Sequence, residues 1–198
     1  MESKAILTDS HSLIESIIKD FEEFNPNDTQ MQLPNLPGNY VVLLKKETPF
    51  PTDVISHIPV MKELEYNDEK YLLIYTGVAD NIKQRIKYHL GDNAGRSTLR
   101  LSLGCLQGYI KINRDRQNEK KKFKFKKTDE QELTEWMKKN LLFLYCENPE
   151  YADYEEKMIS LLNPPLNIQN NKCEENAKFR KDLSSIRRKD TQYEDIIE

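Results

Sequence analysis

Two short apolar runs, each carrying a tyrosine two residues from a glycine, constrain the fold of this chain most strongly. Residues 38–45 and residues 71–76 both alternate side chains between two faces. Such alternation is typical of strands. Gly77 follows the second run and begins the connection to a helix. We therefore expect two neighbouring antiparallel strands, with Tyr40 near the start of one and Tyr75 near the end of the other.

The next stretch, residues 81–90, has the periodicity of a short helix. Its apolar side chains recur four residues apart and form one stripe: Ile82, Ile86 and Leu90. Asp80 is placed to cap the first amides, while Arg85 and His89 lie along the edge of the stripe. Polar groups beside a core are costly without partners. A snorkelling arginine with a structural histidine, and a pair that serves chemistry, are the two alternatives.

A second helix, expected after Asn148 and Pro149, carries a carboxylate on its apolar side. Asn148 would be the cap and Pro149 the first helical residue. The apolar face consists of Tyr151, Tyr154, Met158, Ile159, Leu161 and Leu162. Glu155 projects inside this face, whereas Glu156 projects toward water. An inward carboxylate must be paired, protonated or bound to a cation. A salt bridge, for example to Arg85, and a Mg²⁺ site are both open.

The order of these parts resembles the GIY-YIG nuclease family. The resemblance is carried by Gly38-Asn39-Tyr40, Tyr75-Thr76-Gly77, the helix with Arg85 and His89, Glu155 and Asn167. Two spacings also match the family, ten residues from Tyr75 to Arg85 and twelve from Glu155 to Asn167. Asn39 and Thr76 depart from the apolar residues usual in the family. Val78 stands where some members carry a lysine that assists catalysis.

The resemblance implies an α+β fold in which a small, mainly antiparallel sheet is surrounded by helices. It also implies a metal-dependent DNA endonuclease with DNA as partner. Cutting both strands with one active site requires either a homodimer or two successive nicks, and both are open. In family terms, Glu155 would hold Mg²⁺ or Mn²⁺ against the scissile phosphate. Arg85 would clamp the phosphoryl oxygens, where a bidentate guanidinium fits best.

The remaining catalytic roles also follow from the family. Tyr40 would help to activate water or accept its proton, although a phenol with a pKa of about 10 is a poor base unless its pKa is shifted. His89 would relay protons, because imidazole titrates near neutral pH. Tyr75 and Asn167 would orient the phosphate and the metal shell.

The net charge of −3 hides strong local asymmetry. Residues 1–30 contain seven acids and two lysines, whereas residues 111–127 contain nine basic residues and two acids. Residues 178–189 contain six basic residues and one acid. Phosphate binding depends on local positive surface rather than on the sum over the chain, so the acidic balance does not exclude DNA.

Five candidate DNA-contacting residues lie in or near basic stretches: Arg96, Arg100, Lys122, Lys124 and Lys126. The two arginines would share one face of a helix expected over residues 96–103. Residues 122–126 alternate lysine with phenylalanine, so a strand there would bury the aromatic rings and present a row of lysines. The lysine row equally suits an edge strand protected against pairing, and the two interpretations are compatible.

Three regions are expected along the chain. Residues 1–35 would form an amphipathic helix, over 10–24, and a proline-containing link. Residues 36–168 would form the nuclease-like domain, with an insertion at 46–69 between its first two strands. Residues 169–198 would be a polar and basic tail that is helical or disordered.

Two further elements are expected between residues 128 and 146. Thr128 to Gln131 match a capping box, which would open a helix with three inward side chains, Leu133, Trp136 and Met137. The continuous apolar run from Leu141 to Cys146 predicts a buried strand.

Several classes of protein are disfavoured by the composition. The chain has no run of 18 apolar residues, and residues 1–10 lack a basic stretch followed by an apolar one, so neither a membrane span nor a signal peptide is expected. Cys105, Cys146 and Cys173 are widely spaced, which suits reduced thiols in the cytoplasm and gives no zinc motif. A Walker-type phosphate loop is also absent from the sequence.

Two other functions compete with the endonuclease. The first is a nucleic-acid-binding module on the same fold without turnover. The second is a protein that docks a partner through the acidic N-terminal helix. That all six site positions are filled argues against the first, because a non-catalytic protein has no physical reason to keep an inward, unpaired Glu155.

Overall fold

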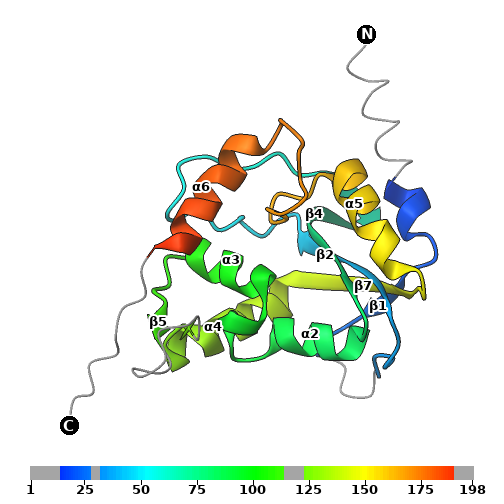
Figure 1. The fold of residues 1–198 in the computed structure, drawn as a ribbon, viewed down its shortest axis with the longest axis horizontal. Coiled ribbons are helices and arrows are strands. Elements are labelled where there is room, and N and C mark those ends of the chain that lie inside the picture. Colours follow the sequence, from blue (N-terminus) through cyan, green and yellow to red (C-terminus); the bar gives the residue numbers. More distant parts are fainter. Residues whose placement is uncertain (1–13, 28–31, 114–122, 190–198) are drawn as a thin grey trace.

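Strand β2 (Gly38–Lys45) forms the middle of a five-stranded antiparallel sheet in the computed structural model, which describes residues 14–27, 32–113 and 123–189 (Figure 1). The strand order is β1-β7-β2-β4-β3. The other four strands are β1 (Glu22–Phe24), β3 (Glu63–Tyr66), β4 (Glu69–Ala79) and β7 (Leu141–Glu147). The expected α+β class and the antiparallel pairing of the two tyrosine strands are therefore confirmed.

Helices cover both faces of this sheet. They are α2 (Ile82–Leu90), α3 (Thr98–Leu106), α4 (Lys127–Asn140), α5 (Tyr151–Leu162) and α6 (Ala177–Arg188), with a 3-10 turn η1 (Ala94–Arg96) and a helical turn at 14–18. A second, two-stranded ribbon pairs β5 (Ile112–Asn113) with β6 (Phe123–Lys124).

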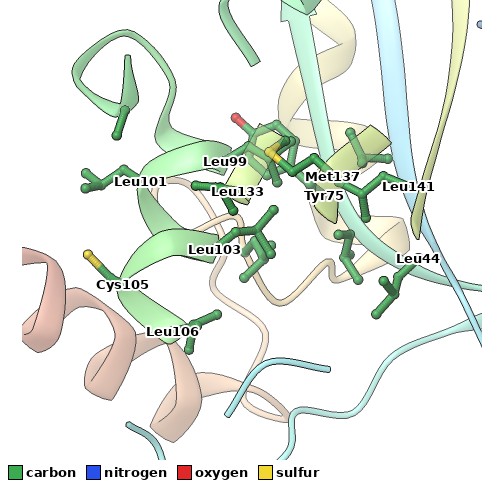
Figure 2. Close-up of a cluster of buried hydrophobic side chains, with 14 of the residues drawn as sticks. Leu44, Tyr75, Leu99, Leu101, Leu103, Cys105, Leu106, Leu133, Met137 and Leu141 are labelled. Carbon is green, nitrogen blue, oxygen red and sulfur yellow. The ribbon is translucent and has the colours of Figure 1, made fainter. Parts of the chain in front are cut away.

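The sheet separates two hydrophobic cores. On one face, α5 and the turn at 14–18 pack on side chains such as Val41 and Leu43. On the other face, α2, α3, α4 and α6 enclose a larger core around Tyr40 and Val42. Figure 2 shows part of that larger core, where Leu99 and Leu103 of α3 lie toward Tyr75 and Met137, with Leu101 and Cys105 on the other side of the helix.

A β-bulge in β4 sets which face each of its residues meets. Val42 pairs with Tyr75, but the next residue of β2, Leu43, pairs with Leu73, so Ile74 is an extra residue. Such an insertion shifts the side-chain alternation by one position. Leu73 therefore joins the smaller core, whereas Ile74 and Tyr75 both join the larger one. The uninterrupted alternation expected over residues 71–76 is wrong at this point.

The insertion at 46–69 contributes an edge strand. Its last part, β3, forms a hairpin with β4 through a turn in which Asn67 and Asp68 have φ angles of 51° and 62°. Two successive residues with positive φ are typical of the tight turn that matches strand twist. The insertion is thus partly a structural extension of the sheet.

The N-terminal part of the described chain differs from the expected helix, whereas residues 177–188 of the expected tail take the helical form that was one of its two alternatives. Residues 14–18 are helical, but Glu22–Phe24 pair with β7 as a strand, so a single helix over 10–24 is wrong for its last residues. In the expected tail, α6 packs on α3 and buries Phe179 and Leu183. Among the described residues, no helix has the length and apolar character needed to cross a membrane.

Helix α4 begins without the capping box expected at Thr128. Its cap residue is Lys126, and no side chain caps it. Glu130, at the fourth position of the helix, instead accepts hydrogen bonds from the amides of Ala94 and Phe125, both at 2.9 Å. Leu133 and Met137 are buried as expected, and Trp136 is partly buried.

Candidate active site

Tyr40 and Tyr75 lie on one face of the sheet, with ring centroids 6.2 Å apart. Tyr40 pairs with Gly77 across the two strands, and its ring lies directly over that glycine. A Cβ atom on Gly77 would collide with the phenol of Tyr40, and one on Gly38 would collide with the carbonyl of Cys146. Both glycines are therefore required by close approach rather than by a turn.

A buried chain of polar side chains runs from Arg85 through Tyr40 to His89 and Ser97. Arg85 Nε donates to the Tyr40 hydroxyl at 3.2 Å. That hydroxyl lies 2.8 Å from His89 Nε2, and His89 Nδ1 lies 2.6 Å from Ser97 Oγ. Tyr40 and His89 are fully buried, while Arg85 is half-buried. The arginine and histidine beside the α2 stripe are thus joined by the first tyrosine.

Burial decides the protonation states of Tyr40 and His89 in this row of hydrogen-bonded side chains. It raises the pKa of Tyr40 well above its usual value, and the neighbouring Tyr75 adds to the effect. Burial, followed by the charge of Arg85, holds the pKa of His89 well below its usual value. At neutral pH Tyr40 is therefore a phenol and His89 a neutral imidazole, so the expectation that His89 titrates near neutrality does not agree with its surroundings.

Ser97 and Arg100 hold His89 from the side of α3. Ser97 Oγ contacts the imidazole and also caps α3 by accepting from the Arg100 amide at 3.0 Å. The Arg100 side chain is completely buried and donates from Nε to Glu130 Oε2 at 2.6 Å. Its Nη1 lies 3.5 Å from the His89 carbonyl oxygen, and Nη2 donates to the Glu130 carbonyl.

Tyr75 faces a cavity of about 350 Å³ that lies between α3, α5 and α6. Its hydroxyl is 3.2 Å from Thr98 Oγ1. Glu155, from α5, lines the same cavity, as does Asn167 from the loop after α5. The cavity therefore brings three of the expected site residues together. Arg187 and Arg188, from the end of α6, also line it.

Glu155 is half-buried, whereas its neighbour Glu156 is exposed. Among the residues that the structure describes, the Glu155 side chain has no hydrogen bond or ion pair, so the alternative of a salt bridge to Arg85 is not realised. Helix α5 begins at Tyr151, two residues later than expected. Two of its expected inward residues, Tyr154 and Leu161, are exposed.

The two atypical motif residues hold the site together. Asn39 is buried and donates from Nδ2 to the Tyr151 carbonyl at 3.1 Å, while the Asn148 side chain donates from Nδ2 to Asn39 Oδ1 at 2.7 Å. These bonds fix the start of α5 to β2. Thr76 donates from Oγ1 to the Tyr40 carbonyl at 3.1 Å. Both polar side chains thus find polar partners inside the fold.

Asn167 is fastened to the β4 backbone. Its Oδ1 accepts from the Thr76 amide at 2.9 Å, and its Nδ2 donates to the Thr76 carbonyl at 2.8 Å. The side chain is buried and both of its polar atoms are engaged. This geometry suits a residue that positions the strand next to Tyr75.

The donor set fits a cation that keeps much of its own water. Within the described residues, no three His, Cys, Asp or Glu side chains are grouped as a metal cage. Mg²⁺ is usually held by one or two carboxylates with waters and substrate phosphate. The unpartnered Glu155 carboxylate, beside an open cavity of 350 Å³, meets that requirement.

The expected DNA contacts receive different surroundings. Arg96 is exposed, and its guanidinium lies 5.4 Å from the Tyr88 ring centroid. The prediction that Arg100 contacts DNA is wrong. Its guanidinium has no exposed surface and is paired with the Glu130 carboxylate, so it cannot reach a phosphate. Lys124 is half-buried on β6 and Lys126 is exposed at the start of α4. Lys122 lies outside the described residues.

Replacing Lys124 and Lys126 by Gln should weaken binding to all DNA sequences alike. If both contact backbone phosphates, the slope of log affinity against log salt should flatten by about 0.9 for each lost contact on duplex DNA. Fluorescence anisotropy across a salt series measures this slope. Lys138 and Lys139 are exposed on α4 and provide a control pair with the same charge loss. An unchanged slope in the Lys124 and Lys126 variant would mean that these lysines contact no phosphate and only protect the edge of the ribbon against pairing.

Sequence reasoning missed three contributors to the site. Ser97 could have been found, because a serine before the apolar run of α3 is a cap signal. Glu130 could not, since its partners lie 5 to 36 residues away. Arg187 was visible only as part of a basic stretch.

Comparison with known proteins gives one family. The family model described as the GIY-YIG catalytic domain matches residues 38–189. This range contains all six expected catalytic residues and extends through α6. No curated protein and no solved structure matches the chain.

Proposed function

Because the chain belongs to the GIY-YIG catalytic domain family, we propose that it is a divalent-metal-dependent endonuclease that hydrolyses phosphodiester bonds in DNA. The observation that carries the proposal is the half-buried, unpartnered Glu155 carboxylate, which lines one cavity with Tyr75. Tyr75 in turn lies beside the chain that joins Arg85, Tyr40 and His89. A lone carboxylate, a guanidinium and a proton acceptor are the groups that phosphodiester hydrolysis requires.

Glu155 would hold the metal ion, Mg²⁺ or Mn²⁺. When bound, such an ion polarises the scissile phosphate and stabilises the leaving oxygen. Arg85 would bind the phosphoryl oxygens, because a guanidinium has five N–H donors and Tyr40 takes one of them. Its half-buried position strengthens that interaction relative to an exposed arginine.

Tyr40 and His89 would move the proton of the attacking water. The phenol is a poor base alone, because its pKa is raised. The 2.8 Å contact allows Tyr40 to pass its own proton to His89 Nε2 while it accepts one from water. Because burial lowers the pKa of His89, its imidazole is neutral before the reaction and Nε2 would have a lone pair to receive that proton. Ser97 would hold the ring in position throughout.

A time course on supercoiled, linear, flapped and branched DNA tests the proposal. Cleavage should occur with Mg²⁺ or Mn²⁺ and stop in EDTA. Appearance of nicked circles before linear DNA would indicate one active site acting twice, whereas direct linearisation would favour a homodimer. DNA binding without cleavage on all four substrates and with either metal would support the non-catalytic module instead.

Replacing Arg85 by Ala should reduce cleavage far more than DNA binding. Its interaction is concentrated on charge that develops in the transition state, and removal of such a donor costs roughly 10²–10³-fold in rate. Single-turnover cleavage and equilibrium binding in Ca²⁺ measure the two effects separately. Lys83, exposed on the same helix, provides a control when changed to Ala. A loss of affinity as large as the loss of rate would make Arg85 a simple phosphate anchor.

A further inference from the structure

Helix α6 brings an unpartnered guanidinium to the wall of the candidate active site. Arg187 is half-buried and lines the cavity that contains Glu155 and Tyr75. Its side chain has no hydrogen bond or ion pair with any residue that the structure describes. Its backbone is held in place, because Lys111 Nζ donates to the Arg187 carbonyl at 2.7 Å.

The surroundings of Arg187 do not compensate its charge. Burial lowers the pKa of this guanidinium, and the adjacent Arg188 acts in the same direction. The groups that oppose the shift are Cys105 and Tyr75, and neither is a carboxylate. A half-buried cation with no carboxylate in contact with it is costly, so the cavity favours an anion from outside the chain.

The arrangement of charges along the cavity indicates which anion. Arg187 and Arg188 come from α6, whereas the Glu155 carboxylate comes from α5. A strand of DNA fits both the acidic and the basic part of the cavity lining. One phosphate would share a cation with Glu155, and the next phosphate would contact the arginines. Guanidinium groups bind phosphate by paired N–H donors.

We propose, on the basis of the endonuclease function, that Arg187 binds the phosphate adjacent to the scissile phosphate on the strand being cut, with Arg188 supporting it. The C-terminal helix would therefore be part of the DNA-binding surface. Its role is to fix the register of the cleaved strand relative to Glu155, and this makes α6 a positioning element rather than a tail.

Arg187→Gln tests the proposal, with Lys178→Gln as the matched control. Lys178 is exposed on the same helix and pairs with Asp182 at 3.0 Å, away from the cavity. The Arg187 variant should bind short duplex DNA roughly tenfold to hundredfold more weakly in EDTA, as expected for loss of a charged hydrogen bond. The control should bind within experimental error of the wild type. Thermal unfolding of each variant checks that α6 remains folded.

A modified substrate identifies the contact. After the wild-type cut site is mapped, the phosphate on either side of it is replaced by an uncharged methylphosphonate, one position at a time. One of the two substitutions should reduce wild-type cleavage and binding by the same factor as Arg187→Gln, and should add little to the variant itself.

Two results would overturn the proposal. One is an Arg187 variant that binds and cuts like the Lys178 control. The other is that both methylphosphonate substitutions weaken binding and cleavage by the Arg187 variant as much as they weaken those of the wild type. Should the wild type cut nothing with any metal, the endonuclease function fails, but the affinity difference in EDTA still decides whether Arg187 meets a phosphate.

Discussion

Glu155→Gln should yield a folded protein that binds DNA and does not cut it. The substitution keeps the size of the side chain but removes the charge that would hold the cation. Loss of a metal-held phosphate clamp should cost several kcal/mol of transition-state stabilisation, roughly a thousandfold or more in rate. Single-turnover cleavage of a labelled duplex, with Mg²⁺ and with Mn²⁺, measures this loss.

The neighbouring residue provides the control for that experiment. Glu156 is exposed on the same turn of α5, so Glu156→Gln should cut nearly as well as the wild type. Equal loss of activity in both variants would point to a general effect of charge on α5. Undiminished cleavage by the wild type in EDTA would remove the need for a metal ligand at Glu155.

Arg100→Ala should destabilise the fold by about 3–5 kcal/mol, because it leaves a buried carboxylate without its charge partner. Glu130 is 2% exposed, so water cannot replace the guanidinium. For a chain of this size the loss corresponds to a fall in the unfolding midpoint of roughly 6–20 °C. Urea unfolding followed by circular dichroism measures the free energy directly.

A double variant separates the ion pair from the packing. Arg100→Met with Glu130→Gln removes both charges and keeps Oε1 of residue 130 as an acceptor for the Ala94 and Phe125 amides. It should recover a large part of the stability lost in Arg100→Ala. If Arg100→Ala alone lowers the free energy of unfolding by less than about 1 kcal/mol, water or other groups must replace the guanidinium.

The strands and helices of the site were largely predictable because local patterns specify them. The runs that became β2 and β7 are short, continuous apolar stretches, and the stripe that became α2 has one clear helical period. The bulge at Ile74 was not predictable. Residues 71–75 are all apolar, so no polar side chain marks where the alternation shifts phase. The shift depends on pairing with β2, more than 30 residues earlier in the chain.

Individual site residues divide in the same way. The inward position of Glu155 follows from the helical period, and the structure agrees with it. Arg100 has the sequence signature of a surface residue, because nothing within its own helix reveals the carboxylate of Glu130, 30 positions later. The lowered pKa of His89 was equally hidden, since it results from burial by several elements together.

The loop after α5 takes the place of a neighbouring strand along the part of β4 that β3 does not cover. Leu166 donates to the Ile74 carbonyl at 3.1 Å, and Asn167 binds both backbone groups of Thr76. Together with Asn39 at the other end of α5, these bonds tie Glu155 and Tyr75 into one rigid frame. The entropic cost of ordering these two side chains is therefore met when the chain folds. Substrate binding does not have to offset that cost.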